Sequence, residues 1–241
     1  MIKNLVIFFL GLFDKFHNKK IINFLKTENI QEFNVFFDIG AHKGETIILF
    51  NKYFKIKKLY SFEASPINFI KLKERENFLK HKFKYTDIIL ENIALGSKEG
   101  IVSFKQLNES SSSTIKKLNE NSTYYKKKMK FLNLFNSKDK NYEEFNLKVE
   151  TLKNYISEKK INSIDLIKID TEGYEYEILK GLGNKIVDVK YILFEHHYDN
   201  MIQKNYTFTD INNLLKNYNF KSVFKKKMPF RKTFEYIYKN K

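Results

Sequence analysis

The sequence Asp38-Ile39-Gly40-Ala41-His42-Lys43-Gly44 joins a short apolar run, residues 35–37, to a helix that we expect to begin at residue 45. A buried strand that turns sharply through glycines into a helix is typical of a nucleotide-binding crevice. Gly40 and Gly44 have no Cβ, so the backbone can turn tightly and a ligand can lie against it. We therefore expect Gly40, Ala41 and Gly44 to line a ligand site.

Two features distinguish this turn from a dinucleotide-binding loop. Position 42 is a histidine, whereas close approach to a pyrophosphate requires a glycine. Asp38 ends the strand, where a carboxylate repels phosphate and attracts a cation. A nucleoside that carries positive charge suits the turn better, and S-adenosylmethionine is such a molecule. Lys43 favours an anion instead, and a purely structural turn is the remaining alternative.

Apolar runs typical of strands alternate with helical patterns along the chain, and this alternation predicts an α/β sandwich of the Rossmann-like class. The last two runs have no helix between them, so we expect an antiparallel hairpin at the edge of a mostly parallel, seven-stranded sheet. The expected strands are residues 35–38, 59–63, 88–95, 164–170, 189–195, 220–224 and 234–238, with a short extra strand at 101–104. The expected helices include residues 65–80, 151–159, 172–180 and one capped by Thr209-Asp210.

Polar residues stand at the ends of five of these strands. The carboxyl ends of parallel strands meet at one edge of a sheet, and ligands bind beyond that edge. Glu63 is expected to accept hydrogen bonds from ribose hydroxyls, and Asn92 to contact the edge of an adenine. A solvated acid and an ordinary turn asparagine are the alternatives. The five residues are Asp38, Glu63, Asn92, Asp170 and Glu195.

Three side chains near this edge are candidate catalytic groups: Asp170, Glu172 and His196. Lys168 shares a strand face with Asp170 and is expected to pair with it. The two acids have a structural alternative, because carboxylates at a helix N-terminus are stabilised by its dipole. A histidine beside a reaction crevice is a proton acceptor near neutral pH, although a partly exposed histidine at a strand end is equally ordinary.

The motifs at these positions strongly resemble those of FkbM-type methyltransferases, over residues 34–224. They are Asp38-Ile39-Gly40-Ala41 with Gly44, Phe62-Glu63, Asn92-Ile93-Ala94-Leu95, Leu166-Ile167-Lys168-Ile169-Asp170 with Glu172-Gly173, Ile178-Leu179-Lys180-Gly181 and Leu193-Phe194-Glu195. The resemblance implies an S-adenosylmethionine-dependent O-methyltransferase that acts on a hydroxyl of a small molecule or glycan. The chain departs from the family at Lys153, where an aspartate is common.

Composition offers a second class of function. The net charge is +16, and a basic module that binds nucleic acid or an anionic surface is the alternative to an enzyme. Of the 44 basic residues, only Arg75 and Arg231 are arginine, and this scarcity argues against nucleic-acid recognition. A nicotinamide dehydrogenase is disfavoured by the missing glycine at position 42.

The chain has no cysteine, which excludes disulfides and thiolate sites and is compatible with the cytoplasm. Its five histidines show no metal-binding spacing, so we expect no metal. We divide the chain into a helical extension, residues 1–32, and a methyltransferase domain, residues 33–241. The domain carries a low-complexity insertion over residues 107–142, either a lid or a solvated loop. Apolar residues 5–13 are too few to span a bilayer; they cover the domain's edge or make a peripheral membrane contact.

Overall fold

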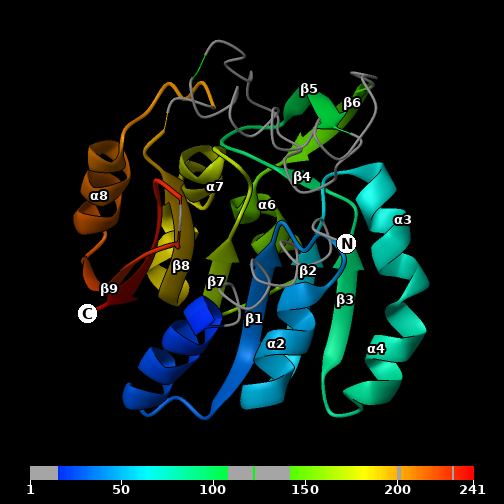
Figure 1. Ribbon diagram of the computed structural model, residues 1–241, viewed down its shortest axis with the longest axis vertical. Coiled ribbons are helices and arrows are strands. Elements are labelled where there is room, and N and C mark those ends of the chain that lie inside the picture. Colours follow the sequence, from blue (N-terminus) through cyan, green and yellow to red (C-terminus); the bar gives the residue numbers. More distant parts are fainter. Residues whose placement is uncertain (1–15, 108–121, 123–141, 200–201, 230) are drawn as a thin grey trace, which may run out of the picture.

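The structure is a computed structural model that describes residues 16–107, 122, 142–199, 202–229 and 231–241 (Figure 1). Its main sheet has seven strands in the order β3-β2-β1-β7-β8-β10-β9. All pairs are parallel except β8–β10 and β10–β9, which confirms the predicted sheet with its antiparallel hairpin. The strands are β1 (Glu32–Ile39), β2 (Lys55–Phe62), β3 (Asp87–Glu91), β7 (Ile164–Ile169), β8 (Val189–His197), β9 (Phe220–Lys227) and β10 (Thr233–Asn240).

Helices cover both faces of this sheet, and adjacent strand residues supply the two cores. On β1, Phe36 packs against Phe50 of α2, whereas Phe37 packs on the opposite face against Tyr155 of α6. The first face also receives the helix at 16–27, with α3 and α4; the second also receives α7 and α8. The bounds are α2 (Glu45–Tyr53), α3 (Pro66–Glu74), α4 (Glu76–Lys82), α6 (Leu152–Glu158), α7 (Glu175–Gly181), the 3-10 helix η2 (Gly183–Asp188) and α8 (Phe208–Asn217).

A second, three-stranded sheet lies beyond the carboxyl ends of the parallel strands (Figure 1). It consists of β4 (Ala94–Leu95), β5 (Gly100–Leu107) and β6 (Tyr142–Glu150). The predicted extra strand at 101–104 is therefore confirmed within β5. The single strand predicted over residues 88–95 is wrong, because the chain leaves the main sheet after Glu91 and β4 pairs with β6 instead.

Three helix boundaries also differ from the prediction. The helix expected over residues 65–80 begins as predicted after Ser65, which caps it, but it divides into α3 and α4 at Arg75. The helix expected to begin at Glu172 begins at Glu175, because Glu172 and Gly173 have positive φ angles of 50° and 95°. The cap of α8 is Thr207, which forms a capping box with Asp210, instead of Thr209.

The helix at 16–27 is part of the domain core, because Ile21, Ile22 and Leu25 are buried against the sheet. The apolar run at 5–13 lies outside the described residues, as does most of the insertion predicted at 107–142. Among the residues that the structure describes, no helix is both long and apolar enough to cross a membrane.

Candidate active site

A cavity of about 480 Å³ opens at the carboxyl ends of the parallel strands, between these ends, the second sheet and the helix at 16–27. This volume lies in the range of small-molecule sites. Six of the residues predicted from the sequence line it, namely Gly40, Ala41, Glu63, Asp170, Glu172 and Glu195. Four others do not, namely Asp38, Gly44, Asn92 and His196.

The two glycines of the first turn are required by close approach of protein atoms. Gly40 has φ +86°, and a Cβ there would lie 1.9 Å from the carbonyl oxygen of Asp170. Gly44, with φ +85°, is the N-cap of α2, and its Cβ would lie 3.0 Å from Leu72. Gly40 therefore lets the loop after β1 cross the loop after β7, whereas Gly44 serves packing away from the cavity.

Glu63 extends from the end of β2 into the cavity and is held by backbone amides. Its two oxygens accept hydrogen bonds from the amides of His42, at 2.7 Å, and Ser65, at 2.9 Å. Burial raises the pKa of Glu63, although these amides oppose the shift. Asn92 donates to the backbone oxygen of Glu63 at 2.7 Å, so it supports this loop from outside the cavity.

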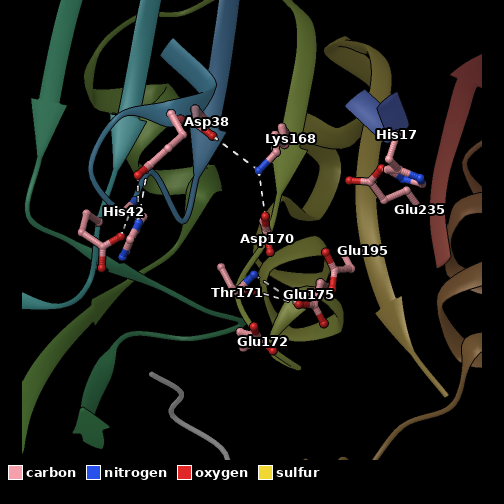
Figure 2. A network of polar contacts seen from close by, with 12 residues as sticks. His17, Asp38, His42, Lys168, Asp170, Thr171, Glu172, Glu175, Glu195 and Glu235 are labelled. Atoms are coloured by element: carbon pink, nitrogen blue, oxygen red, sulfur yellow. Dashed lines mark hydrogen bonds and ion pairs between the residues drawn. The ribbon is translucent and has the colours of Figure 1, made fainter. Parts of the chain in front are cut away.

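Lys168 lies between two acids, and Figure 2 shows the three side chains in a row. Its Nζ atom is 3.0 Å from Asp170, as predicted from the strand period, and 3.9 Å from Asp38. Burial raises the pKa of Asp38 to about 7, although Lys168 opposes this shift. Asp38 is fully buried behind Lys168, so the cation near this carboxylate is supplied by the protein itself.

The loop after β7 is shaped by an acid outside the set of predicted site residues. Glu175 accepts hydrogen bonds from the amides of Thr171, at 3.3 Å, and Gly173, at 3.0 Å, while Tyr206 donates to its other oxygen at 2.6 Å. The loop therefore places Glu172 at the cavity, before α7 begins. Glu172 is not in the first turn of α7, where the helix dipole alone would have explained an acid.

The two adjacent histidines of β8 face opposite sides of the sheet. His196 lies among aromatic rings, including Tyr198 and Phe208, and burial lowers its pKa to about 3. His197 Nε2 lies 3.0 Å from Glu195 and 3.2 Å from Glu172, both of which line the cavity. Alternate residues of a strand share one face, which is why Lys168 was expected to pair with Asp170. The same rule applied to Glu195 predicts that His197 lies beside it, so His197 could have been found from the sequence.

These buried groups predict higher stability at pH 7 than at pH 9. Burial raises the pKa of Asp38 to about 7 and, together with Asp170, that of Glu195 to about 8. The folded protein therefore takes up protons below pH 9 that the unfolded chain, whose carboxyls titrate near 4, does not. Burial opposes the charge on His197, but Asp199, Glu172 and Glu195 raise its pKa, which acts in the same direction.

We expect the melting temperature to rise by roughly 5 °C from pH 9 to pH 7, as thermal unfolding would measure. In Glu195→Gln the rise should be smaller, because one of the groups that takes up a proton is gone. An unchanged slope in this variant would contradict the assignment of the titration to Glu195.

Comparison with known proteins adds the family. The family model of the FkbM methyltransferase domain matches residues 38–222. This range contains β2, β3, β7 and β8 in full and one end each of β1 and β9, but not β10. The chain belongs to the FkbM methyltransferase family. The match begins at Asp38 and contains Glu63, Asp170 and Glu172 of this FkbM domain. Lys153, the departure from the family pattern, is exposed on α6 and does not line the cavity.

Solved structures support the fold of this FkbM domain. It is similar to the FkbM methyltransferase of Methylobacillus flagellatus KT, with a TM-score of 0.55, 14% identity and coverage of 86% of this chain and 43% of that one. It is also similar to the magnesium protoporphyrin IX methyltransferase of Synechocystis PCC 6803, solved with S-adenosylhomocysteine, with a TM-score of 0.52, 7% identity and coverage of 95% and 84%. The chain thus spans less than half the length of the Methylobacillus protein. A comparison with curated proteins gave no significant match.

Proposed function

We propose that the protein is an S-adenosylmethionine-dependent O-methyltransferase that acts on a hydroxyl of a small molecule or glycan. The observation that carries the proposal is the position of Glu63, a carboxylate held at the cavity wall by two backbone amides, inside a chain segment that matches the FkbM methyltransferase domain. The Synechocystis structures, which hold S-adenosylmethionine or S-adenosylhomocysteine, support the choice of cofactor.

The lining residues suit this cofactor. Glu63 is 7% exposed and can accept further hydrogen bonds from the ribose hydroxyls, because each carboxylate oxygen has two lone pairs. Apolar side chains of the second sheet and the chain leading to it, Ile93, Leu95 and Phe104, line the same cavity and suit an adenine ring. Asp38 acts through Lys168, because it is buried behind that amine.

The acceptor hydroxyl would bind at the acids that end β7 and β8. When bound, S-adenosylmethionine supplies a methyl group activated by a sulfonium. Asp170 keeps its negative charge, because Lys168 lowers its pKa against the effect of burial, so it orients the hydroxyl. Glu172 and Glu195, joined through His197, receive the hydroxyl proton, and Glu195 thus takes the place predicted for His196. A base whose pKa is near the working pH is the more effective proton acceptor.

Calorimetric titration with S-adenosylmethionine tests the cofactor assignment. We expect saturable binding by the folded protein. The absence of binding at millimolar cofactor, with the fold verified by circular dichroism, would refute the proposal.

Glu63→Gln should weaken cofactor binding by about 10- to 100-fold, because charge-assisted hydrogen bonds contribute about 1.5–3 kcal/mol. The same titration measures this. The matched control is Glu91→Gln: Glu91 ends the neighbouring strand β3, bonds to Tyr155 at 2.8 Å and does not line the cavity. Wild-type affinity in Glu63→Gln would remove Glu63 from the site.

A further inference from the structure

Part of the cavity wall is built by chain segments outside the family match. The match begins at residue 38 and ends at residue 222, so it includes neither the helix at 16–27 nor the C-terminal segment 223–241, which contains β10. We call the residues of these outer segments that line the cavity the outer wall. They are His17, Asn18, Ile21, Met228, Arg231 and Glu235. The cofactor-side residues Gly40, Ala41 and Glu63 all lie inside the match.

A buried contact between His17 and Glu235 joins the two outer segments. His17 Nε2 lies 2.5 Å from Glu235 Oε2, with the two side chains 2% and 9% exposed, and Figure 2 shows them together beside β8. Removing either partner would leave a buried polar group without its hydrogen bond, so His17 holds the Glu235 carboxyl group in position at the cavity wall.

Glu235 also extends the row of acids that ends the parallel strands. In the antiparallel pairing of β10 with β8, Glu235 lies directly opposite Glu195, so both side chains project from the same face of the sheet. Both are 7% exposed and both line the cavity. Each carboxyl group keeps free acceptor sites beside its histidine partner, so a ligand that donates hydrogen bonds can bind to both.

The charge of the cavity is opposite to that of the whole chain. Among the lining residues that the structure describes, Lys168 and Arg231 are permanent cations, and Lys168 is already paired with Asp38 and Asp170. Arg231 acts electrostatically on Asp170 as well. Six lining residues are acids, namely Glu45, Glu63, Asp170, Glu172, Glu195 and Glu235. The cavity is therefore acidic in a protein of net charge +16, and it disfavours anionic ligands.

We propose that the outer wall selects the methyl acceptor, and that Glu235, positioned by His17, binds a polyol that carries an amine and no anionic group. The inference rests on the proposed methyltransferase function and adds the chemical class of the acceptor. The hydroxyls of such a polyol donate to the carboxyl groups of Glu235 and Glu195, and its ammonium is favoured because acids outnumber permanent cations among the described lining residues.

Three methyl glycosides test this proposal: that of glucose, that of glucosamine, in which an amine replaces the 2-hydroxyl, and that of glucuronic acid, in which a carboxylate replaces the 6-hydroxymethyl group. Their affinities are measured by calorimetry on the protein loaded with S-adenosylhomocysteine. We expect the glucosaminide to bind at least about tenfold more tightly than the glucuronide, with the glucoside between them, as expected for one charge-assisted hydrogen bond. In Glu235→Gln this preference should fall by about tenfold.

The matched control is Glu28→Gln. Glu28 follows the same helix and bonds to Lys239 of the same strand at 2.7 Å, but it lies away from the cavity, so this variant should keep the wild-type preference. If Glu235→Gln does not fold, His17→Gln is used instead, and its preference for the glucosaminide over the glucuronide should also fall by about tenfold.

Equal binding of the glucuronide, absence of binding by all three glycosides, or a wild-type preference in both wall variants would overturn the inference while leaving the proposed function intact. Failure of the wild-type protein to bind S-adenosylhomocysteine would instead overturn the proposed function and this inference with it.

Discussion

Gly40→Ala should destabilise the protein by about 2–6 kcal/mol and eliminate cofactor binding. The added Cβ would meet the carbonyl oxygen of Asp170 at 1.9 Å, and the positive φ of Gly40 is strained for alanine. Backbone strain and overpacking each cost about 1–3 kcal/mol. The two loops that cross here carry Ala41 and Glu172, so their separation would open the cavity. Urea unfolding measures the first effect and calorimetry with S-adenosylmethionine the second.

Gly183→Ala is the matched control for this prediction. Gly183 also has a left-handed backbone, with φ +51°, but the nearest atom to an added Cβ is a flexible Lys153 carbon at 3.3 Å. We expect a loss of about 1 kcal/mol and unchanged cofactor affinity. Similar losses in the two variants would show that backbone strain, and not the contact with Asp170, decides the effect at Gly40.

Lys168→Met should cost about 3–5 kcal/mol, because it leaves the buried Asp38 and the neighbouring Asp170 without their shared countercharge. Although burial favours the neutral amine, the two acids raise the pKa of Lys168 above its ordinary value. A raised lysine pKa contributes stability that is present through neutral pH and is lost only as the pH rises through the folded pKa. Urea unfolding at pH 7 measures the loss.

The pH dependence separates charge from packing in this variant. Without Lys168, the pKa of Asp38 should rise further above that of the unfolded chain, and the pKa of Asp170, which Lys168 lowers in the wild type, should rise as well. The free energy of unfolding should then increase more steeply than in the wild type between pH 8 and pH 5. Adding Asp38→Asn to Lys168→Met should restore part of the stability at pH 7. A loss that is independent of pH, with no rescue, would assign the effect to packing alone.

Strand and helix positions could be predicted because each depends on neighbouring residues. The apolar runs of β7 and β8, the Ser65 cap and the terminal hairpin all have local patterns, and all are confirmed. The run at 88–95 predicts one strand, because its two halves are equally apolar, but the structure has two strands there. Only the pairing partners distinguish β3, beside β2, from β4, beside β6.

The sequence predicts candidate site residues where a motif places them at or just after the end of a strand. Glu63, Asp170 and Glu172 line the cavity, as predicted, whereas Asp38 and Asn92 lie behind the residues that do. Strand ends show which residues reach an edge of the sheet, but not which of them are covered there by another side chain.

The α/β alternation, the glycine turn at 38–44 and the acids at the strand ends follow from the sequence, because periodicity and turn chemistry act over a few residues. The pairing of cations with acids from distant parts of the chain follows from the folded arrangement. Lys168 meets Asp38 from another strand, and His17 meets Glu235 across 218 positions of the chain. The first contact depends on the pairing of β1 with β7, and the second on how the helix at 16–27 packs on the sheet. Neither arrangement is encoded by a local sequence pattern.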